Sequence, residues 1–301
     1  MVYSKFNTQE NYLKTRSKNR YMKANNKIDL AAFRKQGYCL VKGLFDPKQV
    51  DEIKSELSKV AALEGSLEPG AFVLEDKHEE IRKRSKNPLD WIRKIDYPAM
   101  SKSEYLMKLF QSNDADIVQI ARQIIGERNL QIIYFSTFAK PPHGGAEIPW
   151  HQDQALWDLW MNTALSGWVA LSKTTDENGV LQFVPGTNLG GIVPHRHYPG
   201  KIHESIRIGD YPDATPVRVY MDPGDCVFFG GRTWHFSEPN NSPNRRLGMP
   251  VVYAGQNDLK DGMACNEWFR SKLDLKDKAV ASLPMSEERV NFYKTRPRVS
   301  S

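Results

Sequence analysis

Hydrophobic residues recur along the chain with a helical period first and a strand period later. In residues 47–63 they return every three or four positions, which predicts an amphipathic helix. Asp46 suits the N-cap, Pro47 the first helical position and Gln49 the capping-box partner, while Gly65 favours a stop. The apolar face of this helix consists of Val50, Ile53, Leu57 and Val60.

Three further helical segments are expected in the first part of the chain. Residues 29–37 form a short one, and residues 103–111 and 114–127 form two longer ones, the last of which stops at a glycine. Residues 38–45 are apolar and strand-like. Residues 66–100 are highly charged, weakly periodic and broken by two prolines, so we interpret them as loop with short helix.

After Gly126 the pattern changes to short apolar runs separated by clusters of proline, glycine and asparagine. Many short strands divided by such turns indicate a β-sandwich or a closed barrel. We therefore predict a mainly β fold with flanking helices. The candidate strands are residues 130–140, 166–173, 180–186, 217–222, 226–231, 234–238 and 247–255.

Composition and charge narrow the class of protein. The chain has 301 residues, of which 40% are hydrophobic, so it has enough apolar side chains for a globular core. Its net charge of +6 comes from the first 27 residues, which hold seven basic residues and one acidic residue. The remaining chain has 35 of each sign, and a charge-balanced body is not typical of a protein that binds phosphate backbones. We predict no nucleic-acid partner.

Cysteine content and hydropathy give an expectation for location. Cys39, Cys226 and Cys265 are too few for a secreted disulfide framework. No apolar run approaches the roughly 20 residues needed to span a bilayer, and the N-terminus lacks the apolar core of a signal peptide. We expect no membrane association and a cytoplasmic location, with an acid-poor transit peptide as the alternative.

The candidate chemistry begins at His151 and Asp153, within the string PWHQDQALW. On an extended segment two residues that are two apart point to the same side, so both side chains can reach one metal ion. His235 follows Asp153 by 82 residues on a late predicted strand and is the candidate third ligand. Two imidazoles and one carboxylate form the ligand set of mononuclear non-haem iron(II) oxygenases. The alternative is a surface histidine bonded to an aspartate.

A basic residue follows the last histidine at a useful distance. Arg246 lies eleven residues after His235 across a turn-rich link, which predicts a hairpin of neighbouring strands. A guanidinium binds a carboxylate through two parallel hydrogen bonds and stays charged when buried, as a 2-oxoglutarate site requires. Ser237 is on the same strand face as His235 and offers a hydroxyl. Arg245 is expected to face outward, and Gly248, on the side of Arg246, to leave room for a ligand.

Four strings in order resemble the phytanoyl-CoA dioxygenase family of iron(II)- and 2-oxoglutarate-dependent oxygenases, from about residue 28 to residue 255. The strings are FRKQGYCLVKGLFDPKQVDEIKSEL, PWHQDQALW, ENGVLQFVPGTN and GDCVFFGGRTWHFSEPNNSPNRRLGMPVVY. The resemblance implies a double-stranded β-helix, the cupin-like jelly roll. It also implies one domain over 28–301 after a basic arm at 1–27. Its parts would be a helical buttress at 28–126, a jelly-roll core at 127–256 and a C-terminal helical tail at 257–301.

The resemblance also assigns roles to single residues. It implies that His151, Asp153 and His235 bind iron and that Arg246 binds the distal carboxylate of 2-oxoglutarate. Gln152, Trp168 and Ser237 match positions that line the cosubstrate pocket in relatives, and Lys140 is a further candidate for the same pocket. The implied cofactors are iron(II), 2-oxoglutarate and O2, with ascorbate as the reductant in vitro.

The implied reaction is oxidation of an unactivated C–H bond, with release of succinate and CO2. Asp153 supplies a carboxylate where halogenating relatives have a small residue, so hydroxylation is expected, with desaturation or oxidative cyclisation as alternatives. Two hypotheses from other functional classes are a metallo-hydrolase that uses the same ligands and a non-catalytic metal-binding β-sandwich protein. The metallo-hydrolase leaves Arg246 unexplained, and a non-catalytic binding protein would be expected to have lost a metal ligand, which this chain has not.

The substrate is expected to be a small molecule, either a specialised metabolite or an amino-acid-like compound. Aromatic and basic residues near the predicted metal strand and in the neighbouring loops are the candidate contacts. The sequence carries no expectation for the oligomeric state. The candidate substrate contacts are Trp157, Trp160, Trp91, Arg93, His195 and His197.

Overall fold

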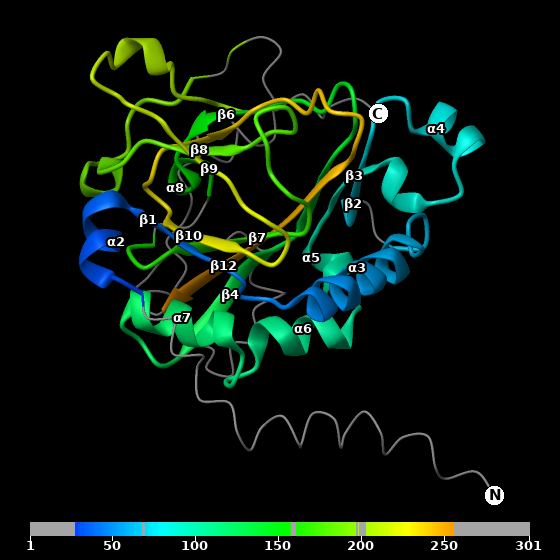
Figure 1. Cartoon of the computed structure of the whole chain (residues 1–301), viewed down its shortest axis with the longest axis horizontal. Helices are drawn as coiled ribbons and strands as arrows, with labels where there is room; N and C mark the ends of the chain where they lie inside the picture. The colour runs from blue at the N-terminus through cyan, green and yellow to red at the C-terminus, as the bar shows by residue number, and fades with distance from the viewer. Residues whose placement is uncertain (1–27, 68–69, 158–160, 197, 199–202, 256–301) are drawn as a thin grey trace, which may run out of the picture.

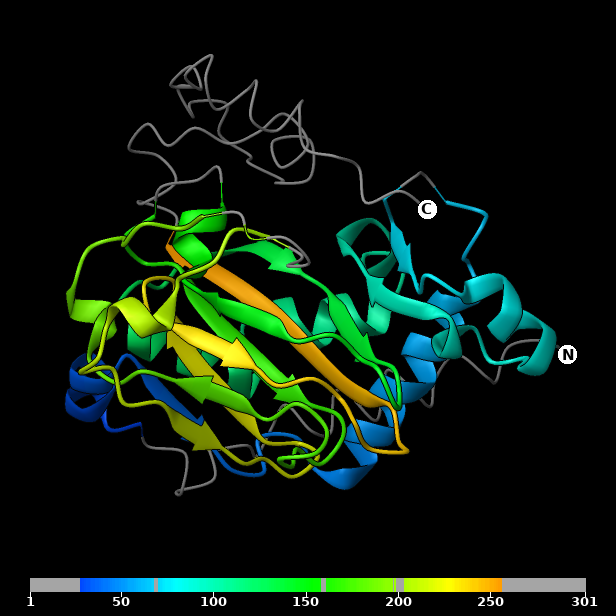
Figure 2. The same cartoon turned by 90° about the horizontal axis from the view of Figure 1, so that it is seen from above.

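The computed structural model describes residues 28–67, 70–157, 161–196, 198 and 203–255. Two antiparallel sheets lie against each other, and helices cover the outer face of the larger sheet (Figures 1 and 2). This two-sheet architecture with flanking helices confirms the predicted jelly roll. The predicted N-terminal arm and C-terminal tail lie outside the described residues. Within these residues, no helix has both the length and the apolar character needed to cross a membrane.

The larger sheet has eight strands in the described part of the chain. Its inner strand β7 (Leu165–Ala170) is buried at every position, because helices cover one face of the sheet and the smaller sheet covers the other. β4 (Leu130–Phe135) pairs with β12 outside the main strand order. That order is β1 (Tyr38–Val41), β10 (Cys226–Gly230), β7 (Leu165–Ala170), β12 (Arg246–Gly255), β5 (Thr137–Lys140), β3 (Ile92–Ile95) and β2 (Phe72–Leu74).

The smaller sheet carries the histidines that the sequence singled out. Its spatial order is β6 (Ile148–His151), β11 (His235–Ser237), β8 (Leu181–Phe183) and β9 (Val217–Val219). Side chains from both sheets, including Trp168, Phe183 and Phe229, form an apolar cluster. This cluster fills one end of the space between the sheets.

Three amphipathic helices pack on the outer face of the larger sheet. They are α3 (Pro47–Ala61), α6 (Glu104–Gln111) and α7 (Asp116–Ile125), whose buried residues belong to the main core with those of β7, β10 and β12. The predicted capping box is present: the backbone N–H of Gln49 donates to Asp46 Oδ1 at 2.9 Å, and the backbone N–H of Asp46 donates to Gln49 Oε1 at 3.1 Å. The helix ends at Ala61, before the glycine that we expected to stop it.

The remaining helices are short. They connect strands or cover the ends of the sheets. The α-helices are α2 (Leu30–Gln36), α4 (His78–Arg84), α5 (Tyr97–Met100) and α8 (Asp153–Leu156), and the 3₁₀ turns are η1 (Pro88–Asp90), η2 (Thr187–Leu189) and η3 (Ile208–Asp210).

Residues 66–100 differ from the expected loop with short helix. They contain β2 and β3, which extend the larger sheet beyond β5, with Lys94 opposite Phe138. β2 is only three residues long, and the two charged residues in the middle of β3 hide the alternation that marks a strand. The segment that we expected to be a helical buttress therefore also supplies an edge of the β-sheet.

Candidate metal and cosubstrate site

The two histidines face each other across neighbouring strands. His235 on β11 is directly opposite His151 on β6, and their ring centroids are 4.0 Å apart. Sheet closure thus brings together residues that are far apart in the sequence, as predicted. Both side chains are buried, at 5% and 6% exposure.

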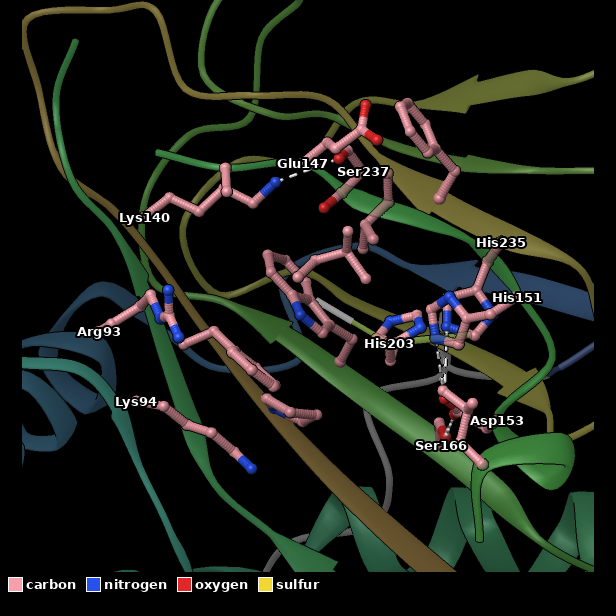
Figure 3. A pocket seen from close by; sticks show the side chains of 18 of the residues that line it. Arg93, Lys94, Lys140, Glu147, His151, Asp153, Ser166, His203, His235 and Ser237 are labelled. Carbon is pink, nitrogen blue, oxygen red and sulfur yellow. Dashed lines mark hydrogen bonds and ion pairs between the residues drawn. The ribbon is translucent and has the colours of Figure 1, made fainter. Parts of the chain in front are cut away.

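Asp153 completes the group. It is the first residue of the one-turn helix α8, which begins just after β6 has ended, and Gln152 between the two ligands has an extended backbone. The two-residue spacing across this extended residue directs the carboxylate to the same side as the His151 imidazole, as predicted. Asp153 Oδ1 is 3.3 Å from His151 Nε2 and 3.5 Å from His235 Nε2. The ligand atoms of the His–Asp–His group (His151, Asp153 and His235) all lie within 4.8 Å of one another (Figure 3).

Backbone carbonyls orient both imidazoles. His151 Nδ1 lies 2.8 Å from the Pro149 carbonyl oxygen, and His235 Nδ1 lies 3.0 Å from the Thr233 carbonyl oxygen. If each Nδ1 carries the proton and donates to its carbonyl, each Nε2 presents a lone pair to the centre of the group. This is the tautomer that a metal ion requires.

The electrostatics of the group favour an ionised Asp153 carboxylate beside a neutral His151 imidazole. Burial by itself raises the pKa of Asp153, but His235 and His151 outweigh it, and the pKa lies well below its ordinary range. Burial, together with the nearby His235, lowers the pKa of His151. A deprotonated carboxylate and unprotonated imidazole nitrogens are what a divalent cation binds.

Arg246 is a buried cation that faces the same cavity. It is 2% exposed, donates from Nη2 to the Gly179 carbonyl oxygen at 3.0 Å, and its Nε has no hydrogen-bond partner. Burial lowers its pKa to about 10, which keeps it charged at neutral pH. Among the described residues, Arg246 forms no ion pair with a carboxylate. A buried guanidinium without a counter-ion is costly, so the cavity favours an anionic ligand.

The route that brings Arg246 to the cavity is not the predicted hairpin. His235 is on β11 of the smaller sheet and Arg246 is on β12 of the larger one, where it lies opposite Lys140. The link therefore crosses from one sheet to the other. The space at Gly248 is also not free for a ligand, because a Cβ there would lie 1.8 Å from the Trp168 ring. Trp168 lies under Arg246, with the guanidinium carbon 5.1 Å from the ring centroid.

Two other predicted cosubstrate residues adjoin Arg246. Ser237 and Lys140 both line the cavity, and the Ser237 hydroxyl has no hydrogen-bond partner although it is buried. Lys140 Nζ donates to the carbonyl oxygens of Ser237, at 3.1 Å, and of Glu238. Burial and the neighbouring Arg246 lower the pKa of Lys140 to about 6.

Gln152 and His195 have structural contacts that the sequence did not reveal. The Gln152 side chain donates to the carbonyl oxygens of Gly191 and Arg232 and accepts from Val193 N–H, so its hydrogen-bonding groups join loops and do not line the cavity. His195 accepts from the Gln152 N–H through Nε2 and contacts the Val193 carbonyl through Nδ1. Both ring nitrogens are therefore occupied, which argues against a substrate contact.

The other candidate substrate contacts divide into three groups. Trp157 and Arg93 line the cavity. Trp91 does not: it is packed in the main core, with its Nε1–H 3.4 Å from Glu64 Oε2. The sequence placed Trp91 in a loop, but its ring packs among the buried apolar side chains of the core. Trp160 and His197 lie outside the described residues.

Three residues that line the cavity were not predicted from the sequence. The Ser166 hydroxyl donates to Asp153 Oδ2 at 2.8 Å, and the His203 ring lies 4.7 Å from that of His151. Lys94 lines the cavity on β3. None of these residues has a sequence signal of its own, because each reaches the cavity only through strand pairing or loop return.

The fold and the His–Asp–His group define a jelly roll of the kind that holds a mononuclear metal centre. The family model described as phytanoyl-CoA dioxygenase (PhyH) matches residues 33–248, more than two thirds of the chain. The chain therefore belongs to the phytanoyl-CoA dioxygenase family, which confirms the resemblance seen in the motifs. It also confirms the predicted enzyme class, the 2-oxoglutarate-dependent dioxygenases, whose cofactors are iron(II) and 2-oxoglutarate.

Individual relatives extend the likeness. A Caenorhabditis elegans protein described as "Probable phytanoyl-CoA dioxygenase" is 32% identical over 148 residues, covering 46% of this chain and 47% of that protein. The L-proline trans-4-hydroxylase of Streptomyces griseoviridis is 30% identical over 158 residues, covering 46% and 59%. The chain thus spans about half the length of these two relatives.

A solved structure shares the fold. The non-heme alpha ketoglutarate dependent carbocyclase SnoK from nogalamycin biosynthesis superposes with a TM-score of 0.62 at 20% identity, covering 86% of this chain and 94% of that one. At this level of identity the likeness concerns the architecture.

Proposed function

We propose that this protein uses iron(II) and 2-oxoglutarate to hydroxylate a C–H bond of a small organic molecule. The observation that carries the proposal is one cavity that holds both the His–Asp–His group and a buried arginine with no carboxylate partner among the described residues. The first provides a metal site and the second provides an anion site. A dicarboxylate that chelates the metal at one end satisfies both.

The residues of the cavity fit both iron(II) and 2-oxoglutarate. The three ligand atoms of the His–Asp–His group are close together, both imidazoles are oriented by backbone carbonyls, and the low pKa of Asp153 keeps its carboxylate ionised. The Arg246 Nε and the Ser237 hydroxyl are buried and have no partner, which suits the distal carboxylate of 2-oxoglutarate. When bound, iron(II) and 2-oxoglutarate activate dioxygen for the oxidation of a C–H bond, and 2-oxoglutarate is converted to succinate and CO2.

The protein's own groups bind, orient and exclude water. We assign His151, Asp153 and His235 to the metal, Arg246 and Ser237 to the distal carboxylate, and Trp168 to the wall that fixes the guanidinium. Burial of these side chains strengthens every charge interaction in the cavity.

The type of reaction follows from one ligand. A carboxylate at Asp153 occupies a position that a halide would need, so we propose hydroxylation, with desaturation or oxidative cyclisation as alternatives. The L-proline trans-4-hydroxylase among the relatives supports the first. A metallo-hydrolase would leave the buried charge of Arg246 without a use. We further propose that the protein is cytoplasmic, because it has few cysteines. We also propose that it acts on a specialised metabolite or an amino-acid-like compound, in line with the L-proline trans-4-hydroxylase among its relatives.

A binding experiment tests the assignment without knowledge of the substrate. 2-Oxoglutarate is titrated anaerobically into the iron(II)-loaded protein, and the metal spectrum and the affinity are measured for wild type, Arg246→Ala and Asp153→Ala. We expect Arg246→Ala to weaken 2-oxoglutarate binding about 100-fold while iron is retained. Asp153→Ala should lose iron affinity and, with a substrate in hand, turnover.

The exposed Arg128 provides the matched control, since Arg128→Ala removes a guanidinium that does not line the cavity. The proposal is wrong if 2-oxoglutarate neither binds nor changes the spectrum of the wild type. The assignment of Arg246 is wrong if its variant binds like wild type.

A further inference from the structure

The cavity extends from the metal group to the edge of the larger sheet and has a volume of about 420 Å³. Its walls between these two ends are mainly apolar. The apolar lining includes Val73, Phe138, Ile148, Leu156, Trp157 and Val252. An occupant in contact with this lining therefore has an apolar middle portion, and its recognition depends on the few charged groups present.

The cavity is also lined by Glu147, whose carboxylate acts on Lys140, and its basic groups can be accounted for one by one. Lys94 Nζ is 2.7 Å from Asp96 Oδ2 and lies over the rings of Tyr134 and Phe138, so its charge is already paired. Lys140 donates to two backbone carbonyls. Arg246 is assigned to the cosubstrate. Arg93 is the remaining basic residue of the lining.

Arg93 has no direct contact with a carboxylate among the described residues. No hydrogen bond or ion pair joins its guanidinium to another described residue, although the side chain is half-buried. Burial raises the pKa of Glu75, and the charges of Arg245 and Arg93 counteract this rise, but the direct ion pair of Glu75 is with Arg245, at 3.4 Å. Arg93 is therefore available to a ligand.

The position of Arg93 separates it from the metal. It is on β3, two strands away from β12 in the larger sheet, whereas the His–Asp–His group is on β6, β11 and α8. In Figure 3, Arg93 lies on the opposite side of the cavity from His151, Asp153 and His235. A molecule that reaches both ends is held by one end and presents the other to the metal.

We propose that Arg93 binds an anionic group of the substrate, a carboxylate or a phosphate, and that this contact directs the apolar portion of the substrate toward the metal. The substrate class is thus a small organic anion with an apolar body. This inference rests on the proposed function, because it takes Arg246 to be occupied by 2-oxoglutarate. A guanidinium suits both anions, since each accepts two parallel hydrogen bonds.

Probe molecules test the inference. The protein is loaded with manganese(II), which replaces iron without turnover, and saturated with 2-oxoglutarate so that Arg246 is occupied. Straight-chain carboxylates, alkyl phosphates, the corresponding primary amides and alkyl amines are then compared by ligand-observed NMR. We expect an anion to bind about tenfold or more tightly than its amide, and the amine to bind more weakly still. Which of the two anions binds more tightly identifies the chemical group.

The paramagnetic metal also reports orientation. Protons at the apolar end of a bound probe should relax faster than those beside the anionic group. The reverse order would mean that the anion binds at the metal, and it would overturn the proposal.

Variants assign the effect to one side chain. Arg93→Gln should remove the preference for anions over amides, Arg93→Lys should retain part of it, and Arg128→Gln should leave it unchanged. The inference is wrong if wild type binds anion and amide equally, or if Arg93→Gln keeps the preference. 2-Oxoglutarate affinity, measured in the same samples, should be the same in all four proteins. If wild type did not bind 2-oxoglutarate, the proposed function itself would be refuted.

Discussion

The Ser166 hydroxyl donates a hydrogen bond to Asp153 Oδ2 at 2.8 Å, and this contact joins the two sheets at the proposed metal centre. Ser166 is on β7 of the larger sheet, and Asp153 begins the helix that follows β6 of the smaller one. The oxygen that Ser166 holds is the one turned away from the imidazoles. The hydrogen bond therefore fixes the rotation of the carboxylate.

Ser166→Ala should lower metal affinity about tenfold, because groups that orient a ligand typically contribute that much or more. Titration with manganese(II) or iron(II) measures it. Ser58→Ala, on the exposed side of α3, is the control and should bind metal like wild type. Unchanged affinity in Ser166→Ala would mean that the turn at α8 holds Asp153 without help.

Gly248→Ala should destabilise the fold by about 1–3 kcal/mol, because the new methyl group would overlap the Trp168 ring. The ring is expected to move, and Arg246 would then lose the surface on which it rests. Chemical denaturation and the affinity for 2-oxoglutarate measure the two effects. Gly191→Ala is the matched control, since a Cβ there has nothing within 4 Å. Equal stability of the two variants would contradict the prediction.

Lys140 should make stability depend on pH. Its pKa is lowered from the ordinary 10.5 to about 6 by burial and by Arg246. Between these values the unfolded chain binds the extra proton, so the free energy of unfolding should rise with pH from about 6 to about 10. Lys140→Met should flatten this rise, and Lys83→Met, at an exposed position, should not. Denaturation curves over this range test it, and parallel curves for Lys140→Met and wild type would show that the group titrates normally.

The same residue should couple 2-oxoglutarate binding to protons. An anion beside Lys140 favours its charged form, so binding should take up a proton above pH 6. Calorimetry in buffers of different ionisation enthalpy measures this uptake. It should disappear in Lys140→Met.

Arg245→Met should destabilise the protein by about 2–3 kcal/mol, because it leaves Glu75 half-desolvated without its cation. Arg245 also donates to the carbonyl oxygens of Asp90 and Ala139, so it holds the segment that carries β3 against β5. A double variant with Glu75→Gln should recover part of the loss. Strict additivity of the two single changes would argue against a direct pair.

The sequence predicted the chemistry of the site better than its geometry. Residue type and order were enough for the His–Asp–His group, because few other arrangements explain a histidine and a carboxylate near one end of a sheet and a second histidine near the other. The strand argument for Asp153 holds in part: Gln152 is extended, so His151 and Asp153 share a side, although Asp153 itself begins a helix. The hairpin argument for Arg246 failed because local spacing does not show that a link crosses between sheets.

Side-chain direction was the other limit. Gln152 is next to a proposed ligand, yet its amide joins two loop segments, and this depends on loop positions that a single sequence does not reveal. Arg93 was placed in a loop and lies on a strand, because its short and charged segment has no visible alternation. In each case long-range packing decided the orientation.

The pairing of β3 with β5 has a consequence for regiochemistry. Lys94 lies opposite Phe138, and this alignment sets how far along the sheet Arg93 lies from the oxidising centre. A slip of two residues in this pairing would move Arg93 by about 7 Å, the length of several carbon–carbon bonds. With the anionic group of the substrate bound at Arg93, the alignment of β3 with β5 would determine which carbon is oxidised.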